Sequence, residues 1–480
     1  MSAAKVDLVI KGGRVVSENG VVDADIAVTD GKIAGIFKPE LAPDAIQVID
    51  ATGRYALPGL IDVHVHFREP GMAHKENWTT GSQAAAVGGV TTVFEMPNTD
   101  PPTDNLNNLA TKRDLAERQS IVDFGLYGLL GEHNLSELER LADGGVIGFK
   151  LFLGNTTGDL PCPDDGAVLE GFEILASLGL RCSIHAENSP ILFWRQRALQ
   201  AAKRNDPLAH LAARTDVVAL EALNRSATLA EWTGARIHIV HESCARSIDF
   251  IKFWKGRGVD LTVETLPQYL YLDAEMMLDD GGEVIRMNPP IREKAHQAPL
   301  WQAVLDGTID MISTDHAPHA AEEKRGDDVW KLACGFPGVE TSLPLMLTAV
   351  NRGRLRLEDI AKLMAASPAR AFGLYGQKGV IAVGADADIT LVDLNAEAVL
   401  SASSLHSKGK CSAYEGMKVK GLPIMTLVRG HVVAKNGEPV AEQPRGRMVS
   451  PTMPAPRPRN QATTLKAVLE PHQKPYGDPL

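Results

Sequence analysis

The feature that most constrains the fold of this chain is a regular alternation of short apolar runs with helix-length segments between about residues 57 and 375. Eight runs read as strands, at residues 61–67, 90–96, 121–129, 146–153, 181–185, 236–241, 260–263 and 310–314. Regular alternation of strands and helices predicts a parallel sheet, and eight such units predict closure into a (β/α)8 barrel of the TIM type. Such a barrel takes roughly 250 residues or more, so a chain of 480 residues leaves room for a smaller domain.

Both ends of the chain have a different sequence pattern, in which short apolar runs alternate with turns. The runs are residues 7–10, 26–28, 33–37, 388–392 and 425–428, and Asp30-Gly31 is a hairpin turn signal between two of them. We therefore predict that residues 1–56 and 376–440 build one small β-sandwich domain beside a barrel of residues 57–375. Residues 441–480 are expected to form an extended Pro-rich tail, with Pro444, Pro451, Pro454, Pro456 and Pro458.

Composition and charge exclude several classes of protein. The net charge is −11, and no run of Lys or Arg forms the basic patch of a nucleic-acid binder, so no nucleic-acid partner is expected. Residues 1–13 lack a signal pattern, and apolar runs such as 235–240 are too short to span a bilayer, so no membrane association is expected. The five cysteines are widely spaced without a Cys-x-x-Cys pair, which favours free thiols and a cytoplasmic location.

The strongest local signal is the pair His64 and His66 at the end of the first predicted strand. Alternate residues of a strand share a face, so both imidazoles point the same way. Two imidazoles at the carboxyl end of a barrel strand suit a divalent metal ion. The alternative is a pair that only forms hydrogen bonds in the core.

Polar residues also stand in or just after other predicted strands, namely Lys150, His185, His241 and Asp315. The carboxyl ends of barrel strands meet on one face of the molecule, where barrel enzymes place their catalytic groups. Lys150 lies among apolar residues and is costly to bury as a cation. It therefore either extends its amine to solvent or faces the metals as a neutral or modified amine.

These residues lie in segments that resemble the amidohydrolase superfamily, and within it the cyclic amidohydrolase branch of dihydroorotase, allantoinase and hydantoinase (dihydropyrimidinase). The segments are 62–66 (DVHVH), 148–152 (GFKLF), 184–187 (IHAE), 240–243 (VHES) and 314–319 (TDHAPH). The resemblance covers roughly residues 5–435.

The resemblance implies a binuclear metal centre that opens a cyclic amide. Lys150 would be carboxylated by CO2 to a carbamate that bridges two divalent ions, and zinc is the expected metal. The other ligands would be His64, His66 and Asp315 for one ion, and His185 and His241 for the second. Asp315 would also be the catalytic residue, which takes a proton from an acidified water and returns it to the departing amide nitrogen.

His238 lies three residues before His241, so it faces the other side of its strand. We therefore expect a structural role for it rather than a place in the metal centre.

Four further residues point to the substrate. Positions matched by Arg68, Asn98 and His319 hold the substrate carboxylate in dihydroorotases, and the one matched by Asn288 touches the ring. A guanidinium suits a carboxylate in geometry and charge, although an ion pair of Arg68 with Glu69 or Glu76 is the alternative. The resemblance therefore predicts a dihydroorotase, which interconverts dihydroorotate and N-carbamoyl-aspartate in pyrimidine biosynthesis.

Allantoinase and hydantoinase are alternatives to this prediction. Residues 153–158 lack the tyrosine usual in hydantoinases, whereas Glu95 and residues 331–338 resemble allantoinases. A non-catalytic scaffold homologue would lose metal ligands, and a mononuclear deaminase would have no use for Lys150 as a bridge. We expect a small cyclic amide that carries a carboxylate as the substrate, and a homo-oligomer, either dimer or tetramer, as in family relatives.

Overall fold

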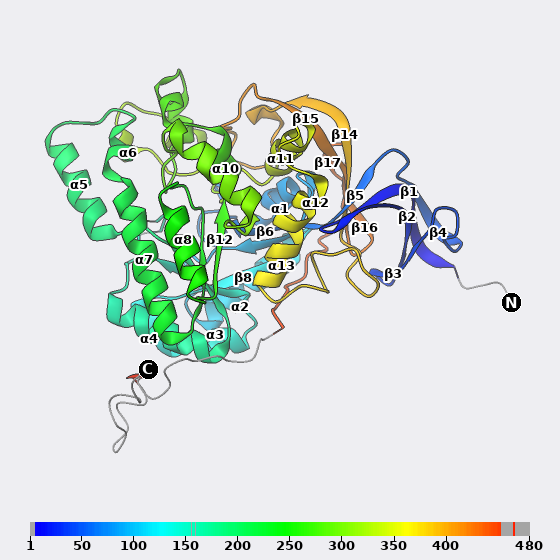
Figure 1. The fold of residues 1–480 in the computed structure, drawn as a ribbon, viewed down its shortest axis with the longest axis horizontal. Coiled ribbons are helices and arrows are strands. Elements are labelled where there is room, and N and C mark those ends of the chain that lie inside the picture. The colour runs from blue at the N-terminus through cyan, green and yellow to red at the C-terminus, as the bar shows by residue number, and fades with distance from the viewer. Residues whose placement is uncertain (1–4, 155, 159, 453–463, 466–480) are drawn as a thin grey trace, which may run out of the picture.

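The eight predicted strands form a parallel barrel (Figure 1). The computed structural model describes residues 5–154, 156–158, 160–452 and 464–465. The barrel strands are β6 (Leu60–Val65), β7 (Val90–Glu95), β8 (Asp123–Leu129), β9 (Gly148–Phe152), β10 (Arg181–His185), β11 (Arg236–Ile239), β12 (Leu261–Thr265) and β13 (Met311–Ile312). Each strand pairs with its neighbours in chain order, which confirms the predicted (β/α)8 architecture.

The barrel closes where its first and last strands meet. Val65 forms a parallel bridge with His316, and the His66 amide donates to the His316 carbonyl at 2.8 Å. Beside this seam, the buried Asp62 carboxylate accepts a hydrogen bond from Thr314 Oγ1 at 2.5 Å. The seam thus fastens β6 to the segment that follows β13.

The last strand, β13, has two residues, whereas the sequence predicted a strand over residues 310–314. Thr314 commits both its amide and its hydroxyl to Asp62. Asp315 then has a left-handed backbone, with φ of 46°, which a strand cannot accommodate. The chain therefore leaves the sheet early, and this places Asp315 at the mouth of the barrel.

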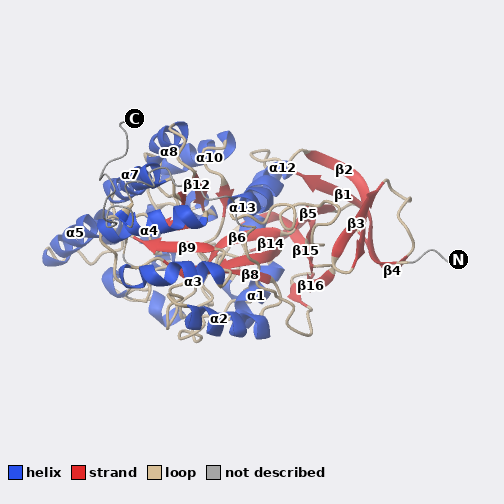
Figure 2. Cartoon of the chain, turned by 90° about the horizontal axis from the view of Figure 1, so that it is seen from below, coloured by secondary structure: helices blue, strands red, loops and turns tan. Residues whose placement is uncertain are grey.

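Helices surround the barrel strands (Figure 2). They are α1 (Trp78–Val87), α2 (Leu106–Gln119), α3 (Leu138–Asp143), α4 (Asp165–Leu178), α5 (Ser189–Ala201), α6 (Ala209–Ala213), α7 (Asp216–Thr233), α8 (Ser247–Gly256), α9 (Pro267–Tyr271), α10 (Gln297–Asp306), α11 (Ser342–Asn351), α12 (Leu357–Ala361) and α13 (Ser367–Ala371). Asn77, Asn105, Asp164 and Asn188 cap α1, α2, α4 and α5 by accepting from an amide three residues later. Such caps satisfy amides that the helix itself leaves unpaired.

The two ends of the chain build one sheet beside the barrel (Figures 1 and 2). Its strands are β1 (Val6–Ser17), β2 (Gly20–Thr29), β3 (Lys32–Phe37), β4 (Ala45–Asp50), β5 (Tyr55–Pro58), β14 (Ile389–Val399), β15 (Lys418–Val428), β16 (His431–Lys435) and β17 (Glu438–Pro439). Asp30 and Gly31 have φ of 53° and 74° and form the predicted turn between β2 and β3. Because β5 lies between β1 and β14, both ends of the chain complete the same small domain, as predicted.

A buried ion cluster joins the small domain to the barrel. The Lys378 amine lies 2.6 Å from Asp388 and 2.9 Å from Asp386, and it also donates to Asp123 at the start of β8. All four side chains are at most 5% exposed. Burial alone would lower the pKa of Lys378, but the three carboxylates raise it above its ordinary value.

The first part of the Pro-rich tail runs along the barrel. The Phe124 amide donates to the Arg447 carbonyl at 3.0 Å, and the Val449 amide donates to the Phe124 carbonyl at 2.8 Å. This segment therefore adds a short parallel bridge at the start of β8. Pro444 and Pro451 lie in the described part, whereas Pro454, Pro456 and Pro458 lie outside the described residues.

The five cysteines all fall within the described part of the chain, and none of them forms a disulfide bond. Among the described residues, no helix combines the length and the apolar character that crossing a membrane requires.

Replacing Lys378 with methionine should lower the free energy of unfolding by about 3–5 kcal/mol, because three buried carboxylates lose their shared cation. Urea unfolding followed by circular dichroism measures this change. Lys32→Met is the matched control, since Lys32 also pairs with Asp386 but is 48% exposed, and it should cost less than about 1 kcal/mol. Equal losses in the two variants would contradict the central role of Lys378.

Candidate metal centre and active-site cavity

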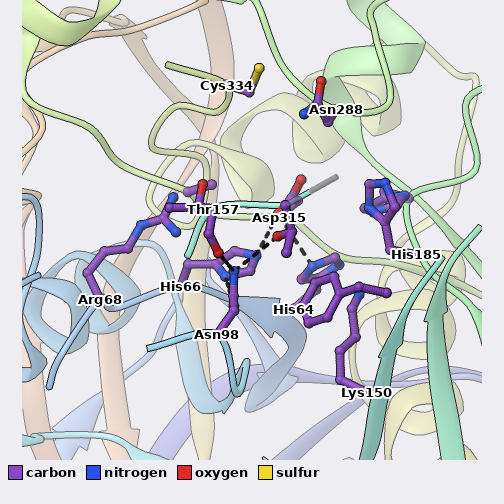
Figure 3. A pocket seen from close by; sticks show the side chains of 14 residues that line it. His64, His66, Arg68, Asn98, Lys150, Thr157, His185, Asn288, Asp315 and Cys334 are labelled. Atoms are coloured by element: carbon purple, nitrogen blue, oxygen red, sulfur yellow. Dashed lines mark hydrogen bonds and ion pairs between the residues drawn. The ribbon is translucent and has the colours of Figure 1, made fainter. Parts of the chain in front are cut away.

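The strands bring the six predicted metal ligands together at the mouth of the barrel (Figure 3). His64 lies near the end of β6 and His66 follows it, Lys150 lies in β9, and His185 ends β10. His241 and Asp315 follow β11 and β13 by two and three residues. All six line one small polar cavity.

His64, His66 and Asp315 form one group. Asp315 Oδ1 lies 3.4 Å from His64 Nε2 and 3.1 Å from His66 Nε2. Burial and the positive charge of Lys150 lower the pKa of His64 to about 4, and burial with the charges of Arg68 and Lys150 lowers the pKa of His66 well below its ordinary value. Neutral imidazoles beside a carboxylate are the ligand set that a divalent transition metal requires.

His185 and His241 form the second group. His185 Nδ1 faces His241 Nε2 at 2.9 Å, and the ring centroids are 4.7 Å apart. Burial lowers the pKa of both imidazoles, so both are uncharged near neutral pH. Two neutral ring nitrogens that point at one spot fit the second metal position.

Lys150 lies between the two groups and is fully buried. Within the described part of the chain, its amine has no hydrogen-bond partner. Burial lowers the pKa of Lys150 to about 8, so a larger fraction of the amine than in an exposed lysine is in the uncharged form that reacts with CO2. An unpartnered amine aimed between two sets of ligands fits a bridging carbamate, whereas a lysine that reaches solvent is excluded by the burial.

The backbone at the site is left-handed at three residues that are not glycine. Arg68, His241 and Asp315 have φ of 63°, 43° and 46°. Each such conformation costs of the order of 1 kcal/mol or more and persists only where surrounding contacts hold it, and these residues cluster at functional sites. Here the conformation turns each side chain from the end of a strand into the cavity.

Glu264 on β12 organises the ligands, although the sequence analysis did not select it. Its carboxylate accepts from His64 Nδ1 at 2.7 Å and from the His241 amide at 3.0 Å. It also lies 3.0 Å from His238 Nε2, which gives His238 the structural place that was expected. Because Nδ1 of His64 is held by Glu264, Nε2 is free to bind metal. A carboxylate inside an apolar strand was the only sequence signal for this role.

Three of the four predicted substrate residues line the cavity. Arg68, Asn98 and Asn288 line it, together with Thr156, Thr157 and Cys334. Asn98 accepts from His66 Nδ1 at 2.9 Å and donates to Thr156 and Thr157, so it orients a metal ligand as well as facing the cavity. Asn288 and Cys334 lie across the cavity from Lys150 (Figure 3).

His319 lies behind Arg68 rather than at the cavity surface. Its Nε2 lies 3.2 Å from Arg68 Nη2 and 3.0 Å from the Cys334 carbonyl, and its Nδ1 lies 3.1 Å from the Lys75 amine. Burial and the charges of Arg68 and Lys75 lower the pKa of His319, so the ring is neutral. His319 therefore supports Arg68 from behind.

Arg68 is 2% exposed, and among the described residues it forms no ion pair within 4 Å. The alternative ion pairs do not form, since Glu69 accepts from Trp78 and Gln119, and Glu76 lies near His316. The guanidinium instead donates to the Pro318 carbonyl at 3.3 Å and faces the cavity. This leaves a buried positive charge available to a ligand.

Comparison with known proteins agrees with this geometry. The model of the Amidohydrolase family matches residues 55–433, so the chain belongs to this family. It is 37% identical to an L-hydantoinase of Paenarthrobacter aurescens over 92% of this chain and 98% of that protein. It is 40% identical to an allantoinase of Solibacter usitatus over 90% of this chain and 94% of that protein.

The solved structure of L-hydantoinase (dihydropyrimidinase) from Arthrobacter aurescens has a TM-score of 0.90 and 37% identity, and it covers 93% of this chain and 100% of its own. The family and these relatives confirm that the chain is a metal-dependent cyclic amidohydrolase. The relatives bear the names of the two alternatives, so they favour hydantoinase and allantoinase over the dihydroorotase that the sequence analysis put first.

Replacing Lys150 with alanine should reduce bound zinc from two ions per chain to one or fewer, because the bridge is lost. Elemental analysis after zinc loading in bicarbonate measures this change. Lys324→Ala is the matched control, since Lys324 is equally buried and also has a pKa lowered to about 8 by burial, but donates to two backbone carbonyls away from the ligands. Two zinc ions in the Lys150 variant would refute the bridging role.

Proposed function

We propose that this protein hydrolyses the ring amide bond of a small cyclic ureide, of the class to which hydantoins and allantoin belong. The observation that carries the proposal is the convergence of His64, His66, Lys150, His185, His241 and Asp315 on one buried face of a small polar cavity. The names of the relatives support the ureide class.

The ligand geometry fits two divalent ions, with Lys150 as a carboxylated bridge. We propose His64, His66 and Asp315 as ligands of one ion and His185 and His241 as ligands of the other. When bound, such a pair of ions acidifies a water molecule and polarises the ring carbonyl.

Asp315 is the residue of this chain that moves the proton. Its carboxylate is buried at the centre of the ligands, and burial raises its pKa although the charges of His64 and Lys150 oppose this. A carboxylate there accepts the proton of the attacking water and delivers it to the ring nitrogen as the amide bond breaks. The neighbouring imidazoles have no free proton to give, because burial holds them neutral.

The cavity walls select the ring. The lining of the cavity offers several polar groups that a small ring can contact. Asn288 lies across the cavity from Lys150 (Figure 3), and Arg68 also lines the cavity, so the Asn288 amide and the Arg68 guanidinium are donors available to a ring. Both groups suit the carbonyl oxygens of a ureide.

A second candidate substrate is dihydroorotate, and the buried Arg68 favours it. A buried cation without an anionic partner is costly, and a substrate carboxylate would pair with it. In allantoin or a hydantoin, the same guanidinium would donate to a neutral carbonyl. The two candidates therefore differ in the charge that meets Arg68.

Steady-state hydrolysis of allantoin, hydantoin, dihydrouracil and dihydroorotate by zinc-loaded protein in bicarbonate tests the proposal. A kcat/KM highest for allantoin or hydantoin supports the ureide assignment. A clear preference for dihydroorotate would overturn it in favour of the second candidate. No turnover of any ring by protein that holds two zinc ions would overturn the proposed reaction.

Asp315→Asn should lower kcat by at least about 100-fold, because the amide keeps an oxygen ligand but accepts no proton. Initial rates at saturating substrate, with zinc content measured on the same sample, check this. Asp388→Asn is the control, since Asp388 is also buried but pairs with Lys378 in the cluster that joins the small domain to the barrel. Wild-type kcat in the Asp315 variant would exclude the proposed proton transfer.

Arg68→Met should raise KM for dihydroorotate by about 10- to 100-fold and KM for hydantoin by less than about threefold, because hydrogen bonds to a charged group are stronger. Lys75→Met removes a nearby positive charge without removing a cavity-lining group, so its effect on KM for dihydroorotate should be smaller. Equal changes for both substrates in the Arg68 variant would contradict a carboxylate-binding role.

A further inference from the structure

A short helix in the connection after β10, α6, carries two residues that support the active site from outside the cavity. His210 lies within α6 and Arg214 caps its C-terminus. The two residues are four positions apart, so their side chains leave the same face of the helix turn. Both are at most 4% exposed, and neither lines the cavity itself.

His210 holds the cavity-lining residue Asn288. Its Nε2 lies 2.8 Å from Asn288 Oδ1, whereas its Nδ1 is buried without a partner among the described residues. A ring that carries its proton on Nε2 satisfies this arrangement by donating to the amide oxygen. The Nδ2 group of Asn288 is then the atom that faces the cavity, and the substrate meets a donor rather than an acceptor.

Arg214 holds the metal ligand His185 through Glu187. The guanidinium donates to the Glu187 carboxylate, which lies 2.8 Å from His185 Nε2. Glu187 is fully buried. When Nε2 of His185 donates its proton to Glu187, Nδ1 carries no proton, and its lone pair is free to bind metal. This Nδ1 lies 2.9 Å from His241 Nε2.

The packing around this chain of contacts is close. A Cβ on Gly154 would lie 2.8 Å from Glu187 Cβ and 2.9 Å from His185 Nε2, so only glycine fits there. Arg292 donates to the Arg214 carbonyl at 3.1 Å and to Ser243 Oγ at 2.9 Å, which ties the end of α6 to the segment after β11. The position of α6 is thus set by the barrel.

We propose that His210 and Arg214 are positioning residues with separate tasks. His210 fixes the donor that Asn288 presents to the ring, and Arg214, through Glu187, fixes the His185 tautomer that binds metal. The inference rests on the proposed function, because it assigns these tasks within that site. It predicts that one helix turn controls substrate affinity and metal affinity independently.

The test compares His210→Leu and Arg214→Met with the matched control Arg195→Met. Arg195 on α5 also donates to α6, at the Ala212 carbonyl, but it is exposed, and within the described part of the chain no hydrogen bond joins it to the cavity residues. For each protein, zinc affinity is measured by competition with a chelator. Values of kcat and KM are measured at saturating zinc on the ring that the wild type hydrolyses best.

Arg214→Met should weaken one of the two zinc sites by about 10- to 100-fold, with KM at saturating zinc changed less than about threefold. His210→Leu should bind both zinc ions normally and raise KM about tenfold. Arg195→Met should match the wild type in both measurements. Equal changes in zinc affinity and in KM for the His210 and Arg214 variants would overturn the proposal. So would wild-type zinc affinity after Arg214→Met.

Two conservative variants keep the test decisive if a truncated side chain prevents folding. His210→Gln retains a donor, so its KM should lie close to that of the wild type. A KM as high as that of the leucine variant would overturn the donor role. Arg214→Lys retains the cation and should bind zinc more tightly than Arg214→Met; equal affinities would overturn the pairing with Glu187. A wild type that holds two zinc ions and hydrolyses no ring would refute the proposed function. The zinc affinities would still test the role of Arg214 in metal binding.

Discussion

The pairing of β6 with the segment after β13 is the contact on which the site depends. His64 lies in the first strand and His66 directly follows it, whereas Asp315 follows the last strand, so their side chains meet only when the barrel is closed. The seam is short, with a backbone hydrogen bond from the His66 amide to the His316 carbonyl at 2.8 Å, but Asp62 and Thr314 reinforce it with a buried side-chain contact. The same interaction therefore completes the fold and assembles the first group of ligands.

Much of this arrangement followed from the sequence because two simple periodicities determine it. Alternation along a strand places His64 and His66 on one face, and parallel strands bring their carboxyl ends to one rim, so His185, His241 and Asp315 had to lie near one another. Lys150 was recognisable because a lone cation inside an apolar strand needs a special environment. These arguments required no knowledge of which strands are neighbours, only that the barrel closes.

The supporting residues could not be found in this way, because their roles depend on which side chains meet across the fold. Glu264 is separated from His64 by 200 residues, and His210 from Asn288 by 78. Asn98 and His319 were assigned to substrate binding, but the orientation of one toward His66 and the place of the other behind Arg68 emerge only from packing. The substrate is least determined, since carbonyl and carboxylate groups both satisfy a buried guanidinium.

The position of β5 between β1 and β14 has a consequence for how the protein is made. A ribosome delivers the N-terminus first, so β1 to β5 emerge long before β14 to β17 are synthesised. Until then, β5 presents an unpaired edge, and unpaired edges are the parts of a sheet most prone to intermolecular association. The barrel strands β6 to β13 lie wholly between these two groups in the sequence. They can therefore all emerge before β14 to β17 are available to complete the small domain. Synthesis of β14, rather than synthesis of the catalytic residues, thus marks the point from which the molecule can protect that edge.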